Sequence, residues 1–268
     1  MARRPAAAPI ALLMLASSYD AILFDLDGVV YRGEELVPRA AETLVRLRQD
    51  GPRVAFLTNN SSRTPEMIAE HLVALGITTS ADEIVTSAGA TAAVLARRGI
   101  AAAYVVGEEG LRRALADAGI HVADGGPVDA VVVGLDRTVT YERLRDAAIL
   151  VDAGAALVGT NPDGSYPTSE GARWPGAGAL LAAVVATTGA DAEIVGKPHP
   201  ALFEAALERT GGSKPLVVGD RLDTDIAGAD ALGWDSALVL TGISTIDELE
   251  GSPWQPTFVL EDIGGLVE

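Results

Sequence analysis

The chain has 268 residues, of which 49% are hydrophobic and 21% are charged, so it is long enough for one large domain or two of ordinary size. Its formal net charge is −17, and such a surface repels nucleic acid and anionic membranes, which we therefore do not expect as partners. The absence of cysteine excludes disulfides and thiol catalysis and fits a cytoplasmic location.

Residues 1–18 combine two arginines with an apolar, alanine-rich run that contains two prolines. A secretory signal has a similar composition, but this run is short and leads directly into the first expected core strand. We therefore expect a disordered N-terminal extension, with Met14 as another plausible start. No other stretch approaches the roughly 18 apolar residues that a membrane span requires.

Short apolar runs alternate along the chain with segments of helical spacing, which is the pattern of an α/β protein with a parallel sheet. We expect strands at residues 21–24, 54–57, 102–106, 130–133, 156–158, 192–195, 216–218 and 236–240, and an edge strand at residues 257–260. We expect helices at about residues 38–50, 65–75, 88–98, 109–118, 141–153, 177–187, 201–210 and 225–231.

The middle of this series reads as a unit of its own, because three short strands alternate there with helices in a βαβαβ order. The original pattern resumes at the expected strand 192–195. We therefore expect a core domain formed by residues 19–86 and 188–268, with residues 87–187 inserted into it as a second α/β domain.

Two carboxylates, Asp25 and Asp27, end the first expected strand, and Gly28 follows at once. In a regular strand both side chains would share a face, where they repel each other unless a cation or a proton lies between them. Ligands of open α/β sheets bind at the carboxyl ends of the strands. A strand end with acidic turn residues explains the pair about equally well, so its interpretation depends on the other strand ends.

Three other strand ends also carry polar side chains. Thr58 and Asn59 open a hydroxyl-rich loop before a helix, and such a loop offers backbone N–H groups to a phosphate. Lys197 follows the strand at 192–195, and Asp220 follows the strand at 216–218. Because the carboxyl ends of parallel strands lie along one edge, these groups can meet there.

Three acids and one lysine at a common edge suit phosphoryl transfer. Asp25, Asp27 and Asp220 form a hard oxygen site of the kind that Mg²⁺ prefers. Lys197 adds a compact positive charge, and phosphoryl transfer needs a nucleophile, charge neutralisation and an acid for the leaving group.

Four segments resemble the four motifs of the haloacid dehalogenase-like hydrolase superfamily. They are Asp25-Leu-Asp27-Gly28, Thr58-Asn59-Asn60, Gly196-Lys197-Pro198 and Gly219-Asp220-Arg-Leu-Asp-Thr-Asp225. The long insert and the forms of the second and fourth motifs are similar to the branch of p-nitrophenyl, phosphoglycolate, glycerol-phosphate, pyridoxal-phosphate and nucleotide phosphatases. The resemblance covers about residues 19–262. It implies a Rossmann-like doubly wound parallel-sheet core with an inserted α/β cap domain of the larger (C2) type.

The resemblance implies a role for each acid. Asp25 would be the nucleophile and form an aspartyl-phosphate. Asp27 would protonate the leaving oxygen and then activate water for hydrolysis of that intermediate. Asp25, the backbone carbonyl of Asp27 and Asp220 would bind Mg²⁺ as the cofactor.

It also implies roles for the residues around the acids. Thr58, Asn59 and Asn60 would hold the phosphate, and Lys197 would offset charge on the nucleophile and the phosphate. Asp225 would orient Lys197 or a metal-bound water.

Contacts to the leaving group would come from the inserted domain. Asn161 and Asp163 are the candidates there, with His199 at the rim of the core. Each of these has a plainer explanation as a turn residue or helix cap, since Asn-Pro-Asp-Gly is a strong turn signal. The roles of Trp174 and Arg221 stay open at this point.

The function that follows is a Mg²⁺-dependent phosphatase for small-metabolite phosphate monoesters. The ester could be glycerol phosphate, phosphoglycolate, a sugar phosphate, a nucleotide or p-nitrophenyl phosphate, and the protein a monomer or a homodimer. A phosphomutase of the same superfamily is an alternative, as is an inactive binding protein. A phospho-acceptor switch is a further alternative, but Asp27 would hasten loss of the phosphoryl group that a switch must keep.

Overall fold

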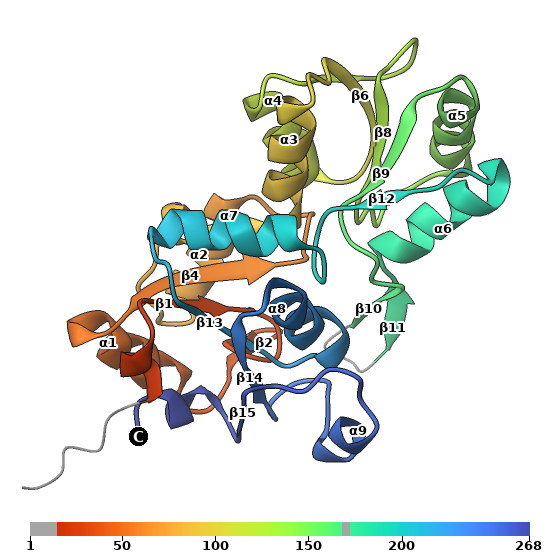
Figure 1. The fold of residues 1–268 in the computed structure, drawn as a ribbon. Helices are drawn as coiled ribbons and strands as arrows, with labels where there is room; N and C mark the ends of the chain where they lie inside the picture. Colours follow the sequence, from red (N-terminus) through yellow and green to blue (C-terminus); the bar gives the residue numbers. More distant parts are fainter. Residues whose placement is uncertain (1–14, 168–171) are drawn as a thin grey trace, which may run out of the picture.

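The computed structural model of the protein describes residues 15–167 and 172–268. Two parallel sheets, each flanked by helices, form two lobes (Figure 1). We call the lobe with the six-stranded sheet the core lobe and the lobe with the five-stranded sheet the cap lobe. The predicted α/β fold is confirmed.

The sheet of the core lobe is parallel throughout. Its strands are β1 (Ala21–Phe24), β4 (Arg53–Thr58), β5 (Ile84–Thr86), β13 (Pro215–Gly219), β14 (Asp235–Val239) and β15 (Phe258–Leu260). Their order is β15-β14-β13-β1-β4-β5, so the expected edge strand is at an edge and the first strand is central. A central strand is covered on both faces, which explains why all of β1 is buried.

Helices cover both faces of this sheet (Figure 1). They are α1 (Ala40–Asp50), α2 (Pro65–Ala74), α7 (Pro200–Thr210) and α8 (Ala227–Leu232). Side chains of β1 alternate between the faces: Ile22 and Phe24 pack in a cluster with α1 and α2, whereas Leu23 packs in a second cluster with α7. Burial of this apolar surface is the main source of stability for the lobe.

The cap lobe repeats the arrangement. Its strands are β6 (Ala102–Val106), β7 (His121–Ala123), β8 (Ala130–Val133), β9 (Ala156–Gly159) and β12 (Glu193–Ile194), and its helices are α3 (Ser87–Arg97), α4 (Glu109–Asp117), α5 (Tyr141–Asp152) and α6 (Ala177–Thr188). The strand order is β12-β9-β8-β6-β7, again parallel. Short elements complete the fold: β2 (Tyr31–Arg32), β3 (Glu35–Leu36), β10 (Ser165–Pro167), β11 (Arg173–Pro175) and α9 (Ile246–Glu250).

One apolar cluster runs through both lobes. It joins Leu57 of β4 and Phe203 of α7 in the core lobe to Leu111 of α4 and Val132 of β8 in the cap lobe, with Leu95 of α3 among them. The two lobes are therefore held together by packing as well as by polar contacts at the site described below.

The structure corrects three element predictions. The strand expected at 192–195 is β12, and it pairs with β9 in the cap sheet instead of joining the core sheet. Strands β5 and β7 were not expected, because three residues are too few to show a period. The helix expected at 225–231 begins as a π-helical turn at Leu222–Ile226 before α8. The domain boundaries at 86/87 and 187/188 stay a prediction.

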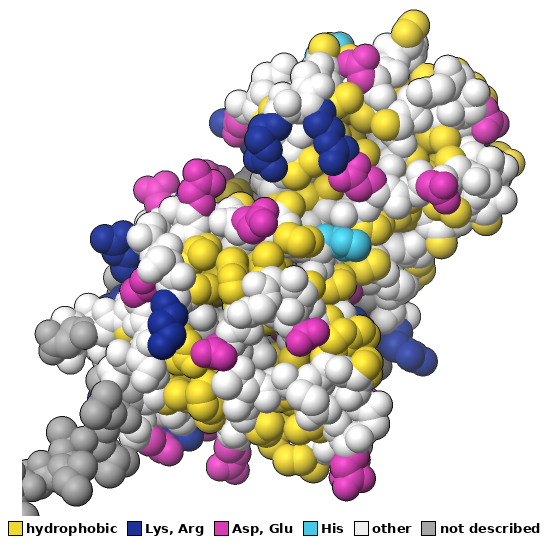
Figure 2. Space-filling view, viewed as in Figure 1, with side chains coloured by type: hydrophobic (Ala, Val, Ile, Leu, Met, Phe, Trp, Pro, Cys, Tyr) yellow, Lys and Arg dark blue, Asp and Glu magenta, His cyan; other side chains and the backbone are white. Residues whose placement is uncertain are grey.

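The expected disorder of residues 1–18 is wrong for its last part. Leu15–Ser18 form a 3₁₀ turn in which Ala16 is fully buried against the core lobe. Residues 1–14 lie outside the described residues. In the described ranges no helix is both long enough and apolar enough to cross a bilayer. Figure 2 shows acidic side chains distributed over both lobes of one face, as the net charge of −17 requires.

Candidate active site

Four charged side chains from separate segments meet at the carboxyl edge of the core sheet. Asp25 follows β1, Asp220 follows β13, Asp225 lies in the π-helical turn and Lys197 lies between β12 and α7. None is more than 8% exposed. We call these four residues the charged cluster.

Lys197 lies between two carboxylates of the cluster. Its Nζ is 2.6 Å from Asp25 Oδ1 and 2.7 Å from Asp225 Oδ1. Burial alone would lower the pKa of Lys197, but the two carboxylates outweigh it and raise the pKa. The ammonium therefore stays charged.

Asp225 has no free carboxylate oxygen. Oδ1 accepts from Lys197 Nζ, and Oδ2 accepts from the backbone N–H of Arg221 at 3.1 Å. It is fully buried, so its role is to hold the lysine in place.

Asp220 is held on one side only. Its Oδ2 accepts from the backbone N–H of Ile243 at 2.7 Å, while its buried Oδ1 has no hydrogen-bond partner in the part of the chain that the structure describes. Gly28 makes room for it, because a Cβ there would lie 2.5 Å from Asp220 Oδ2 and the φ of +83° disfavours other residues. A buried carboxylate oxygen without a donor needs a cation or a proton.

The charges of the cluster support a cation. Carboxylate oxygens of Asp25, Asp220 and Asp225 lie within 4.8 Å of one another, and with the single charge of Lys197 the cluster has two negative charges in excess. Burial raises the pKa of Asp25 and raises that of Asp220 to about 7, with further raising by neighbouring carboxylates. The free oxygen of Asp220 and this excess fit a hard divalent ion such as Mg²⁺.

Asp27 is exposed, unlike the four residues of the charged cluster. The surrounding protein still desolvates the carboxylate enough to raise its pKa, against the opposing charges of Lys197, Arg63 and His71. Arg63 was not singled out from the sequence, although a basic residue at the end of the hydroxyl-rich loop is a signal for anion binding.

The loop after β4 is organised by its own side chains. Thr58 Oγ1 accepts from the N–H of Asn60 at 3.1 Å, and Asn60 Oδ1 accepts from the N–H and the hydroxyl of Ser62 at 2.9 and 2.8 Å. Asn59 reaches Lys197 instead: its Oδ1 accepts from the backbone N–H of Lys197 at 2.8 Å, and its Nδ2 donates to the carbonyl at 3.2 Å. Asn59 therefore connects this loop to the charged cluster.

The cap lobe packs directly against the same loop. Ser61 is fully buried, and its Oγ accepts from the N–H of Leu135 at 3.1 Å, just beyond β8. A Cβ at Gly134 would lie 2.6 Å from that Oγ, and the N–H of Gly110 donates to the carbonyl of Ser62 at 3.0 Å. Ser61 was not predicted from the sequence. The one related feature was Gly134, since a glycine directly after a strand indicates a close approach by another segment.

Asn161 and Asp163 follow β9 and lie beside the loop. Asn161 Nδ2 donates to the carbonyl of Asn59 at 2.7 Å. The two oxygens of Asp163 accept from Asn59 Nδ2 at 3.1 Å and from Arg221 Nη1 at 3.2 Å. The structure thus brings both residues to the edge of the site, and their contact with substrate stays a prediction.

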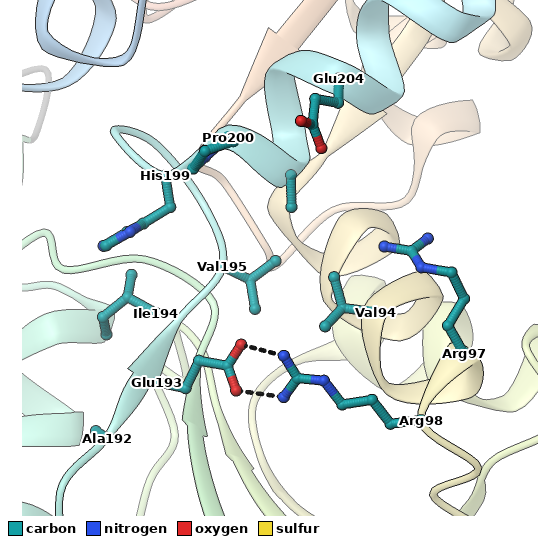
Figure 3. A pocket seen from close by; sticks show the side chains of 11 residues that line it. Val94, Arg97, Arg98, Ala192, Glu193, Ile194, Val195, His199, Pro200 and Glu204 are labelled. Carbon is teal, nitrogen blue, oxygen red and sulfur yellow. Dashed lines mark hydrogen bonds and ion pairs between the residues drawn. The ribbon is translucent and has the colours of Figure 1, made fainter. Parts of the chain in front are cut away.

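His199 does not join this set. It lies at the start of α7 and lines a separate groove of about 600 Å³, together with Ile194 and Glu193 of β12 (Figure 3). In that groove Arg98 pairs with Glu193. Trp174, on β11, is 53% exposed.

Two family models match the chain. The model described as haloacid dehalogenase-like hydrolase matches residues 22–121, and the HAD-hydrolase-like model matches residues 194–266. The two matches contain all four residues of the charged cluster.

Curated and solved relatives match most of the chain. The acid sugar phosphatase of Staphylococcus epidermidis is 39% identical over 91% of this chain and 95% of its own length. The glycerol phosphate phosphatase of Mycobacterium tuberculosis, solved in complex with magnesium, superposes with a TM-score of 0.90 at 38% identity over 95% of this chain and 78% of that one. The 4-nitrophenylphosphatase of Thermotoga maritima has a TM-score of 0.88 at 35% identity, over 94% of this chain and 97% of that one.

Proposed function

The chain belongs to the haloacid dehalogenase-like hydrolases and is a phosphatase of small phosphate esters, and we propose that it cleaves them through an aspartyl-phosphate formed on Asp25. The observation that carries this proposal is the charged cluster, in which Lys197 and the free oxygen of Asp220 flank Asp25.

Asp25 acts as the nucleophile. Its Oδ1 is bound by Lys197, which leaves the second oxygen for attack on phosphorus. As the new O–P bond forms, the ester O–P bond breaks and the leaving oxygen takes a proton from Asp27. Asp27 then accepts a proton from the water that attacks the aspartyl-phosphate, which releases phosphate and restores Asp25.

Asp25 and Asp220, with the backbone carbonyl of Asp27, are the residues that would hold Mg²⁺. When bound there, the ion supplies positive charge to the phosphate oxygens and lets the anionic ester approach an anionic nucleophile. Lys197 supplies the remaining charge, and Asp225 holds its ammonium in line with Asp25.

The loop after β4 holds the transferred phosphate. At the carboxyl end of β4, which pairs with β1, and at the approach to the N-terminus of α2, Thr58 offers its hydroxyl, Asn59 its backbone N–H and Asn60 its side-chain amide. The side chain of Asn59 is engaged at both ends within the protein, whereas Asn60 is engaged at Oδ1 and keeps its Nδ2 amide for the phosphate.

The leaving group is best accounted for as a neutral polyhydroxyl compound, such as glycerol or a sugar. Asn161 and Asp163 line its side of the site, and the nearby cation Arg221 is already paired with Asp163 and Asp223. A carboxylate or second phosphate on the leaving group would have to compete with Asp163 and Asp223 for the positive charge of Arg221. The names of the relatives that hydrolyse sugar phosphates and glycerol phosphate support the same class.

The test is phosphate release by Asp25→Asn. We expect a loss of about 10⁴-fold or more, because the substitution removes the nucleophile and changes few contacts. Circular dichroism should show an unchanged fold. Full activity of this variant would refute the mechanism.

Metal removal tests the cation site separately. EDTA should silence the wild-type enzyme, and excess Mg²⁺ should restore it; indifference to both would refute the site. A screen across glycerol phosphate, sugar phosphates, phosphoglycolate, nucleotides, pyridoxal phosphate and p-nitrophenyl phosphate would then define the ester.

The remaining expectations concern the setting of the enzyme. We propose a cytoplasmic location, which the cysteine-free composition supports. We also propose that the protein is a monomer or a homodimer, and analytical ultracentrifugation would distinguish the two.

A further inference from the structure

The loop of residues 160–164 in the cap lobe, here called the cap loop, contacts the loop after β4 through Thr160 and Asn161, and its carboxylate, Asp163, contacts both Asn59 and Arg221. Asp163 Oδ1 accepts from Arg221 Nη1 at 3.2 Å, and Asp163 Oδ2 accepts from Asn59 Nδ2 at 3.1 Å. Both donors belong to segments that also bind the charged cluster. A carboxylate with both oxygens engaged by protein is poorly placed to bind a substrate hydroxyl as well.

The cap loop is rigid on its own side. Asn161 Oδ1 accepts from the N–H of Asp163 at 3.1 Å, and the carbonyl of Asp163 accepts from the N–H of Gly178 in α6 at 2.9 Å. The N–H of Gly176 donates to the carbonyl of Gly164 at 3.2 Å. The position of Asp163 therefore follows that of α6 and of the cap lobe as a whole.

On the core side, both donors lead to Lys197. Asn59 binds the backbone N–H and carbonyl of Lys197, at 2.8 and 3.2 Å. The backbone N–H of Arg221 binds Asp225 Oδ2, and Asp225 Oδ1 binds Lys197 Nζ at 2.7 Å.

Arg221 is held in its orientation by a second acid. Its Nε and Nη2 donate to the two oxygens of Asp223 at 3.0 and 2.8 Å, which leaves Nη1 directed at Asp163. Asp223 is the more exposed partner, with 57% of its side chain accessible against 19% for Asp163. The Asp163 contact is thus the more buried of the two.

We propose that Asp163 is a positioning residue: its contact with Arg221 and Asn59 couples docking of the cap loop to the placement of Lys197 against Asp25. This inference rests on the proposed function, because it assigns a role in the reaction of the same site. It predicts that loss of the contact slows hydrolysis of every ester, whatever the leaving group, since Lys197 acts at the phosphate.

The experiment compares Asp163→Asn, Arg221→Met and the double variant on glycerol phosphate and on p-nitrophenyl phosphate, with saturating Mg²⁺. We expect each single variant to lower kcat by about 10-fold on both esters, with smaller changes in KM. The double variant should also lose about 10-fold, not about 100-fold, because both changes remove one shared contact. Asp117→Asn is the matched control and should keep at least half of the wild-type kcat, because it breaks only an exposed ion pair with Arg113 within α4 and leaves the Asp163 contact intact.

Each other outcome overturns the proposal. If Asp163→Asn impairs glycerol phosphate alone and its effect adds to that of Arg221→Met, Asp163 is a substrate contact. If kcat is unchanged in both single variants, the contact has no role in the reaction. These outcomes are distinguishable from failure of the proposed function, which would appear as activity of Asp25→Asn.

Hydrogen exchange provides a readout independent of turnover. In Asp163→Asn the backbone N–H of Lys197 should exchange faster than in the wild type, because Asn59 loses one of the partners that hold it. Unchanged exchange at Lys197 would contradict the coupling.

Discussion

The core sheet and the cap sheet share one architecture but differ in the residues at the carboxyl ends of their strands. Both are parallel and flanked by helices (Figure 1), and residues after cap strands β8 and β9 contact the loop that follows core strand β4. Two central strands of the core sheet end in charge, with Asp25 after β1 and Asp220 after β13. The central strands of the cap sheet end in Gly107, Gly134 and Gly159.

The difference shows that one topology supports two tasks. The buried carboxylates at the core edge need compensation from Lys197 and a cation, and in the proposed mechanism one of them attacks the phosphate. Glycines at the cap edge have no side chain, so the backbone of the cap lobe can approach the loop after β4 within hydrogen-bond distance. The chemistry thus belongs to one sheet, and the shape of the site depends on both.

The largest effect is expected from removing Lys197, which compensates the buried carboxylates at the core edge. Lys197→Met leaves Asp25 and Asp225 buried without their shared ammonium. We expect the free energy of unfolding to fall by about 3–5 kcal/mol without added metal, and phosphate release to fall by about 10³-fold. Urea unfolding and a steady-state assay measure the two effects.

The exposed Lys214 provides the control for that variant. Lys214→Met should change the free energy of unfolding by less than about 1 kcal/mol, because Lys214 is exposed and its cation–π contact with Tyr19 is weak at an exposed site. A Lys197→Met protein as stable as the Lys214→Met protein would mean that the cluster does not need its ammonium.

An intermediate effect is expected from adding one methyl group to the cap edge. In Gly134→Ala the new Cβ would lie 2.6 Å from Ser61 Oγ and 3.0 Å from Leu111 Cδ2. We expect a destabilisation of about 1–3 kcal/mol. Phosphate release should fall by about 10-fold or more, because the loop after β4 is displaced.

Gly251→Ala is the matched control, since no atom lies within 4 Å of a Cβ at that position. It should match the wild type in both measurements. If Gly134→Ala also matches, the close approach of the cap edge does not determine the geometry of the loop.

The smallest effect on stability is expected from breaking an exposed ion pair that lies away from the charged cluster. Arg98 and Glu193 pair across the groove in Figure 3, with side chains 50% and 42% exposed. Arg98→Met should cost less than about 1 kcal/mol, and the cost should vanish at high salt because solvent and ions screen an exposed pair. Unfolding curves at low and high ionic strength measure it, and a loss of catalysis in this variant would contradict the division of tasks.

The strands and the charged residues were predictable for the same reason. An apolar run such as Ala21–Phe24 reports burial directly, and the polar residue that follows it reports the edge where the sheet meets solvent or ligand. The two-residue strand β12 was assigned to the wrong sheet, because its pairing depends on where α6 returns the chain. Ser61 was missed because a buried hydroxyl has the same sequence pattern as a solvated one.

The sequence by itself determined the alternation of strands and helices, the acids and the lysine at the strand ends, and through them the class of chemistry. Those features are local, since periodicity and residue type report burial and backbone preference within a few residues. Only the tertiary structure decided that Asn59 binds Lys197 and that Asp163 meets Arg221, 58 residues further along the chain. Such contacts depend on how two whole lobes pack, and no short stretch of sequence contains that information.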